Sequence, residues 1–163
     1  MNTMKEAVKE STTLKELVTD LVRNCPALTV LLITKEGTVI TEAGDVASLN
    51  TTAVAALVAG MFSATREVAR MVGEKQFSIL LQQGEKRHIH ISLVTDSAMM
   101  VIVFEDYHSI GRVRLEARKC GDKIAQMMRA GAGQSSAQGD ALSMPQFKEF
   151  ALNLIDQIFA TKK

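Results

Sequence analysis

A run without charged residues, from Leu49 to Thr65, constrains this chain more than any other feature. It lies in a segment of helical character that follows Asn50, a good N-cap residue, and stops at Gly73, a good residue for the position after a helix. At about 100° per residue, two apolar stripes separate on this helix. A helix that lies on one face of a small sheet needs only one such stripe. The second stripe therefore predicts contact with another polypeptide.

The two stripes differ in the size of their side chains. We expect the bulky stripe to pack on the sheet, and it consists of Val54, Val58, Met61, Val68 and Val72. Small side chains let another backbone come close, and the second stripe consists of Ala53, Ala56, Gly60, Ser63, Ala64 and, at its end, Glu67. Three kinds of contact could cover this second stripe: loops of the same chain, a second copy of the chain, or a protein ligand. We favour the last two.

The rest of the pattern predicts a mixed α/β domain. Helical spacing of apolar residues predicts a first helix over 14–22, which stops before Pro26, and another helix over 109–128. Aliphatic and β-branched runs predict strands over 27–34, 38–43, 77–83, 87–95 and 99–105. The order α-β-β-α-β-β-β-α predicts a five-stranded, mostly antiparallel sheet with helices on both faces, an α/β (α+β) sandwich of the profilin-like kind.

The strand over 77–83 carries little charge and is a bare edge in this topology. Exposed apolar edges invite aggregation unless they pair. Pairing with its own symmetry mate would remove the hazard. The edge strand and the second stripe of the helix together predict a two-fold dimer with one continuous sheet.

The pattern changes near the end of the chain, where residues 130–140 are small, polar and rich in glycine. We predict a domain over 1–129, a flexible linker over 130–142 and an amphipathic helix over 143–163. A capping box opens this last helix at Ser143. Its apolar residues share one side: Phe147, Phe150, Leu154 and Ile158.

No pattern in the sequence indicates a catalytic, cofactor or metal site. Cys25 and Cys120 lie far apart and lack the spacing of metal ligands. His88 and His90 share one face of a strand, but only His108 remains as a third imidazole. The glycines form neither a P-loop nor a dinucleotide fingerprint. We therefore expect a protein that is not an enzyme and holds neither cofactor nor metal.

Charge and hydropathy give no support for a nucleic-acid or membrane partner. The formal net charge is +1, and no stretch reaches the roughly 18 uncharged apolar residues of a membrane span. Basic residues over 112–129 would suit an acidic partner or phosphates, but a solvated helix face is the favoured interpretation. Without a signal-peptide pattern at the N-terminus, we expect a cytoplasmic protein.

Two segments carry a family resemblance, LVAGMFSATREVARMVGEKQF at 57–77 and IGRVRLEARKCGDKI at 110–124. Together with the element order and the stretches at 31–44 and 101–111, they resemble the Roadblock (dynein light-chain) family, and within it the bacterial MglB group. The resemblance covers about residues 13–129. It implies a homodimer whose second helices lie side by side and whose third strands pair.

The resemblance also implies a partner, an MglA-type (Ras-like) small GTPase that binds the helical face of the dimer. It implies that the dimer stimulates GTP hydrolysis without an inserted arginine finger and without an active site of its own. The alternative is a non-catalytic scaffold or adaptor that recruits a GTPase or polarity proteins. Roles in cell polarity and motility, with concentration at a cell pole, are further expectations.

Individual positions follow from the same resemblance. It implies GTPase contacts at Ala56, Gly60, Ser63, Ala64 and Glu67, and dimer contacts at Ala53, Phe77, Ile79 and Leu81. The C-terminal helix is similar to one that contacts the GTPase in some members and is linked to nucleotide exchange; here its contacts are Phe147, Phe150, Leu154, Ile155 and Phe159. Met61 and Phe62 replace a smaller or polar pair and predict an altered contact surface.

Overall fold

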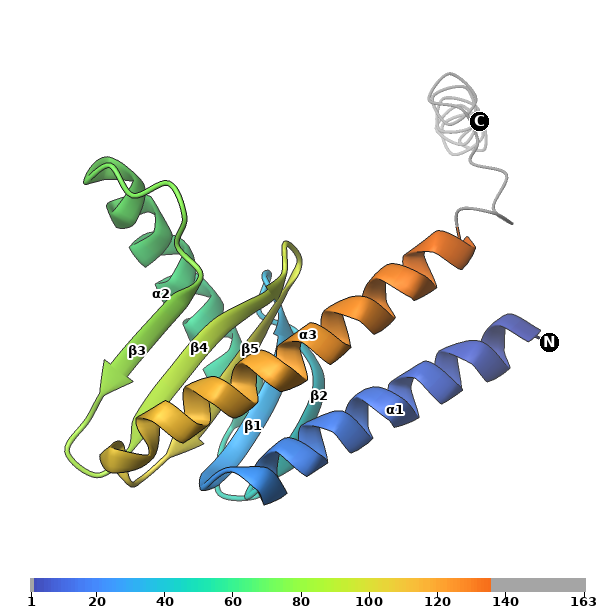
Figure 1. Cartoon of the computed structure of the whole chain (residues 1–163), viewed down its shortest axis with the longest axis horizontal. Helices are drawn as coiled ribbons and strands as arrows, with labels where there is room; N and C mark the ends of the chain where they lie inside the picture. The colour runs from blue at the N-terminus through green and yellow to red at the C-terminus, as the bar shows by residue number, and fades with distance from the viewer. Residues whose placement is uncertain (1, 136–163) are drawn as a thin grey trace, which may run out of the picture. The chain divides into compact units, whose positions relative to one another are not determined.

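The computed structural model describes residues 2–135, with side chains over 12–131. Its elements follow the predicted order (Figure 1). In chain order they are α1 (Asn2–Asn24), β1 (Ala27–Thr34), β2 (Val39–Gly44), α2 (Thr51–Met71), β3 (Ile79–Gln83), β4 (His88–Thr95), β5 (Ala98–Phe104), the short 3₁₀ helix η1 (Tyr107–Ser109) and α3 (Ile110–Ser135).

The five strands form one sheet in the order β2-β1-β5-β4-β3, and all neighbouring pairs are antiparallel. This confirms the predicted sandwich. The strand expected over 77–83 lies at an edge, as predicted, but it begins at Ile79. The central strand β5 is buried at every position, because helices cover both of its faces. An unbroken apolar run such as AMMVIVF is typical of such a strand.

Two hydrophobic cores lie on opposite faces of the sheet. α1 and α3 lie side by side on one face, and α2 covers the other (Figure 1). The α1/α3 core contains Val18, Leu32, Met100 and Ile124, all fully buried. The α2 core is smaller and centres on Leu31, Ile33, Ile91 and Val101 of the sheet. Alternate strand residues serve alternate cores, as the pleat requires.

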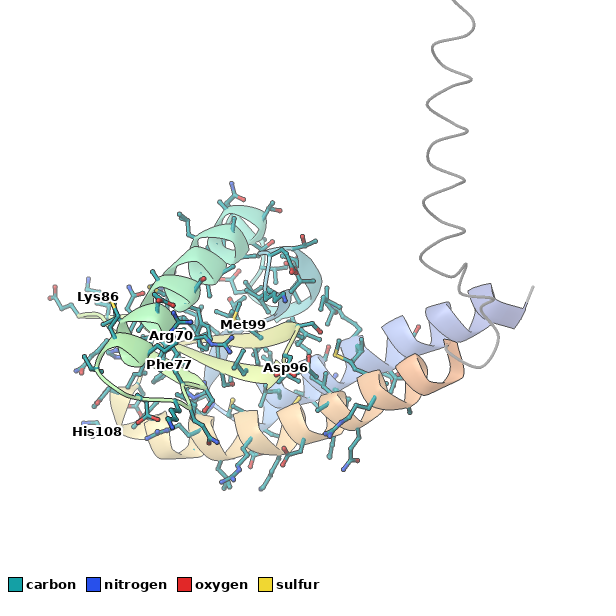
Figure 2. All side chains as sticks on the ribbon, turned by 90° about the horizontal axis from the view of Figure 1, so that it is seen from above. Arg70, Phe77, Lys86, Asp96, Met99 and His108 are labelled. Atoms are coloured by element: carbon teal, nitrogen blue, oxygen red, sulfur yellow. The ribbon has the colours of Figure 1, made fainter. Side chains whose placement is uncertain are left out.

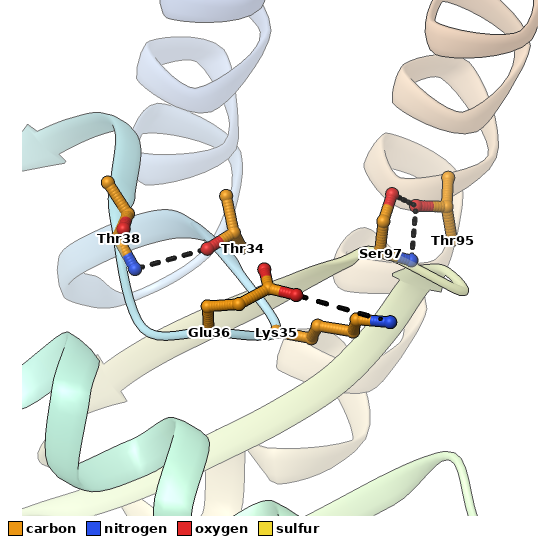
Figure 3. A network of polar contacts seen from close by, with 6 residues as sticks. All are labelled: Thr34, Lys35, Glu36, Thr38, Thr95 and Ser97. Carbon is orange, nitrogen blue, oxygen red and sulfur yellow. Dashed lines mark hydrogen bonds and ion pairs between the residues drawn. The ribbon is translucent and has the colours of Figure 1, made fainter. Parts of the chain in front are cut away.

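Two turns lie at the same end of the sheet (Figure 3), and one backbone hydrogen bond joins them. The Lys35 amide donates to the Ser97 carbonyl at 3.0 Å, and Thr34 and Thr95 side chains accept from amides within their own turns. Gly37 has a φ of +90°, and a Cβ at this position would lie 2.7 Å from the Ala56 Cα. The β1–β2 turn therefore seats the N-terminal half of α2.

The ends of the helices agree with the sequence in part. The Asn50 side chain accepts from the Ala53 amide at 3.1 Å, and Gly73 has a φ of +90°, so the predicted caps of α2 are confirmed. α3 runs to Ser135, so residues 130–135 are helical where coil was expected. A glycine inside a helix costs only about 1 kcal/mol, and alanine offsets part of that cost. Residues 136–163, with the rest of the linker and the predicted last helix, lie outside the described range.

Candidate protein-binding surface on the second helix

The side of α2 that packs on the sheet is formed by two alanines and two larger residues: Ala55, Val58, Ala59 and Phe62. The alanines let the helix approach β1 and β2 closely. Phe62 inserts into the core and meets the ring of Phe77 at a centroid distance of 5.0 Å. The expectation that Phe62 alters a contact surface is therefore wrong, because its side chain is buried; Met61 is half-buried at the rim.

The bulky stripe expected on the sheet is only partly there. Val58 is buried and Val54 is half-buried, but Val68 and Val72 are 58% and 77% exposed. The expectation that the larger side chains would face the sheet is wrong for these two positions. The helix is rotated so that Ala55 and Ala59 face the sheet instead. The C-terminal half of α2 also extends past the strands (Figure 1). These two valines belong to the outer surface.

The outer surface of α2 is apolar along most of its length. All six residues of the small stripe are exposed, as are Leu57 at 74% and Met71 at 80%. We call this surface the open face of α2; it comprises Ala53, Ala56, Leu57, Gly60, Ser63, Ala64, Glu67, Val68, Met71 and Val72. Large apolar residues so exposed on neighbouring positions of one helix mark a contact site.

The sequence carried a signal for Leu57 and Met71 that the two-stripe analysis missed. Positions 53, 57, 60, 64, 67 and 71 are separated alternately by four and three residues. This spacing is the repeat by which two helices pack along a shared seam. At four of the six positions the side chain is alanine, leucine or methionine, and Gly60 has no other atom within 4 Å of a Cβ built on it. A second helix can come close along the open face.

Charge enters only at the C-terminal end of the open face. The Arg70 guanidinium lies 2.9 Å from the Glu67 carboxylate, and both side chains are more than half exposed. Such an exposed pair adds little to stability. Next to it, a hollow of about 570 Å³ is lined by Arg66, Arg70 and, from the loop before β3, Phe77. Figure 2 labels Arg70 and Phe77 at this end of the helix.

The outer edge of β3 offers unpaired backbone groups. The Leu93 amide donates to the Ser78 carbonyl at 2.9 Å, and Ile79 pairs with Ser92. Backbone groups alternate between the two edges of a strand. The N–H and C=O groups of Ile79 and Leu81 therefore point away from β4, toward the open edge. Their side chains lie on the α3 side of the sheet, where Leu81 packs against that core.

The structure thus separates the residues expected at a dimer interface. Ala53 lies on the open face and Ile79 is exposed at the edge. Phe77 precedes β3 and its ring turns inward against Phe62. The part expected of Phe77 in strand pairing stays a prediction. The five contacts expected from the C-terminal helix, Phe147 to Phe159, lie outside the described residues.

Titratable groups do not gather on the open face. Over the described part of the chain, no three His, Cys, Asp or Glu side chains come close enough to hold a metal ion. The two cysteines are buried; burial is the main cause that raises the pKa of Cys25 and raises the pKa of Cys120 to about 11. Among the helices within residues 2–135, none has the length and apolar character needed to cross a membrane.

The antiparallel sheet, with α1 and α3 on one face and the open α2 on the other, defines an α/β sandwich of the Roadblock/profilin-like class. A family model of the Roadblock/LC7 domain matches residues 14–104, and the chain belongs to this family. No curated protein matches the sequence significantly.

Solved structures agree with this assignment. The chain is similar to Myxococcus xanthus MglB, with a TM-score of 0.70 and 28% identity over 74% of this chain and 90% of that one. The gliding protein MglB from Thermus thermophilus gives 0.65 and 24%, over 73% and 88%. A Roadblock/LC7 domain from Streptomyces avermitilis gives 0.64 and 16%, over 71% and 97%, and shows the fold alone. The resemblance to the MglB group is confirmed.

Proposed function

We propose that this chain is a homodimeric regulator of an MglA-type small GTPase, and that it stimulates GTP hydrolysis without contributing a catalytic residue. The observation that carries the proposal is the open face of α2. It is apolar along most of the helix, and no described part of the same chain covers it. Similarity to Myxococcus xanthus MglB supports the choice of partner.

Dimerisation is supported by two independent features. The four-three spacing along the open face suits a second α2, and burying a side chain such as Leu57 or Met71 contributes about 1.5–3 kcal/mol. The open backbone edge at Ile79 and Leu81 suits a second β3. A two-fold axis that brings the two α2 helices and the two β3 strands together would join the two sheets into one. The GTPase would then contact the part of the open face that the second copy leaves uncovered.

Stimulation of hydrolysis does not require a side chain from the regulator. Phosphoryl transfer is catalysed mainly by positioning and charge, and an arginine delivered to the transition state accelerates it about 10³–10⁵-fold. A regulator that binds one conformation of the GTPase more tightly shifts the population toward it. The small side chains at Ala56, Gly60, Ser63 and Ala64 permit the close backbone contact that such selection needs.

The experiment measures GTP turnover by an MglA-type GTPase with and without the full chain. We expect acceleration by the wild type, and at least ~10-fold weaker binding by Ser63→Arg, because a cation would be buried in an apolar contact. Ser63 is exposed on the open face and lies outside the four-three seam, so the substitution leaves the packing of a second α2 in place. Gln126→Arg is the matched control, since it also replaces a neutral, exposed helical residue, on the opposite side of the sheet.

The outcomes separate activation from recruitment. Binding without any change in turnover would contradict the activator and leave a scaffold that holds the GTPase. Equal binding by Ser63→Arg and by the wild type would show that the open face is not the GTPase contact.

A further inference from the structure

A second hollow lies on the other side of the sheet, between α3 and the strands β3 and β4. Its volume is about 550 Å³, within the range of small-molecule sites. The polar and charged residues among its lining come from both layers: Ser78, His90, Ser92, Arg114, Arg118 and Asp122. None of them belongs to the open face of α2, so this groove is separate from the proposed GTPase contact.

His90 is the unusual member of the lining. Its side chain is only 1% exposed, and neither ring nitrogen has a hydrogen-bond partner. Its cross-strand neighbours, Leu81 and Ile102, are apolar and offer no side-chain partner. A buried polar group without a partner costs about 1–3 kcal/mol. An imidazole left in this state beside a groove is suited to a ligand that supplies the missing bond.

The charges around the groove favour an anion. Arg114 and Arg118 are exposed on α3, and neither forms an ion pair with any carboxylate in the described residues. Asp122 is the one carboxylate in the lining, so positive charge predominates. Burial first, and Arg114 second, lower the pKa of His90 to about 4. At neutral pH the imidazole is therefore neutral and has one N–H to donate.

We propose that this groove binds a small molecule through its phosphate group. A phosphate offers acceptor oxygens to the hydroxyl of Ser92 and to the Arg114 guanidinium. The imidazole of His90 is buried directly beneath the groove, and its N–H comes within reach of a bound phosphate only when the side chains over it shift. Guanidinium groups bind phosphate through parallel hydrogen bonds. The groove is much larger than one phosphate, and its apolar lining, which includes Ile79, Val94 and Leu115, would contact an organic body attached to it.

Bound phosphate changes the electrostatics of His90 in a measurable way. In the free protein the nearby Arg114 disfavours the imidazolium. An anion placed between these groups favours it, so ligand binding raises the pKa of His90. From α3 the charged groups that line the groove are Arg114, Arg118 and Asp122; β3 and β5 contribute only apolar partners at this position.

The test follows the assigned imidazole signals of the full chain by NMR during titration with glycerol 3-phosphate, inorganic phosphate and, at equal ionic strength, sodium chloride. We expect a saturable change at His90 and a raised pKa with glycerol 3-phosphate. Saturation by inorganic phosphate as well would show that the phosphate group alone suffices.

Two matched variants complete the test, both at exposed positions of α3, where a substitution is expected to change stability little. Arg114→Gln is expected to weaken binding at least tenfold. Arg112→Gln removes a charge on the same helix outside the lining, and is expected to leave binding within twofold. The proposal is overturned if no probe gives saturation, if sodium chloride gives the same change, or if both variants weaken binding equally.

Discussion

At the scale of single residues, burial in this chain follows position more closely than side-chain type. Ala55 and Ala59 are buried on α2, whereas Met71, on the same helix, is 80% exposed. On β4 a fully buried position is occupied by an imidazole, His90, instead of an aliphatic residue. Apolar side chains are usually buried and polar ones exposed, so Met71 and His90 are both exceptions. A contact from another molecule would bury the Met71 side chain or supply a hydrogen bond to His90.

The burial of His90 makes the stability of the fold depend on pH. Its pKa of about 4 in the folded chain lies below the ordinary value of 6.5. The unfolded chain therefore takes up the proton first as the pH falls. The contribution of His90 is complete above pH 6.5 and is lost progressively between pH 6.5 and 4. At 1.36 kcal/mol per unit of pKa, we expect a loss of about 3 kcal/mol over this window.

Urea unfolding of the full chain at several pH values checks this expectation. His90→Phe should flatten the pH dependence, because it removes the buried imidazole. His108→Gln, at an exposed position on η1, should leave the dependence unchanged. A wild-type profile that is flat between pH 6.5 and 4, or one that His108→Gln flattens equally, would contradict the assignment to His90.

At the scale of elements, the sequence predicted the order of helices and strands, the caps of α2 and the edge position of β3, because each depends on local pattern or on simple topology. It did not predict which side of α2 faces the sheet. The side that packs on the sheet contains Ala55, Ala59 and Phe62, which belong to neither predicted stripe, and it shares only Val58 with the bulky stripe. Helical spacing alone does not fix this rotation, because it depends on the shape of the sheet surface under the helix. The groove beneath α3 could not be predicted from the sequence either. It brings His90 of β4 and Arg114 of α3 together, and only the tertiary packing does this.

The edge of β3 gives the sharpest prediction about the dimer. The Ile79 amide points toward the open edge, so Ile79→Pro removes a donor from an intermolecular ladder and leaves the bonds to β4 in place. We expect at least ~10-fold weaker dimerisation, which is about 1.4 kcal/mol or more. Ile79→Val keeps the N–H and should remain dimeric. Sedimentation equilibrium measures both, and an unchanged association of Ile79→Pro would rule out pairing through β3.

At the scale of the whole molecule, the two proposed binding sites lie on opposite faces of the sheet. The α2 face is apolar and open, which suits a protein partner, while the α1/α3 face carries the groove with His90 and the arginines. The same sheet separates the two sites. A protein ligand and a small anion would therefore bind without competing for the same surface, and any influence of one on the other would pass through β4 and β5.

The tail beyond Ser135 should be separable from the folded domain. Among the residues whose side chains the structure describes, both hydrophobic cores lie between Leu14 and Met128. We therefore expect a chain that ends after Ser135 to unfold within about 0.5 kcal/mol of the full chain and to remain dimeric. A chain that ends after Ala117 is the control, since it loses the fully buried Ile124 and should be several kcal/mol less stable.

Assays of GTP hydrolysis and nucleotide release separate the role of the tail from that of the domain. If the open face of α2 is the activating contact, the chain that ends after Ser135 should accelerate GTP hydrolysis as the full chain does. If the predicted helix over 143–163 acts on nucleotide exchange, only the rate of nucleotide release from the GTPase should fall on truncation. Fluorescent-nucleotide release and GTP turnover, measured on the same samples, separate the two. A truncated chain that binds the GTPase but no longer accelerates hydrolysis would place the activating contact in the tail, because the open face would still be intact.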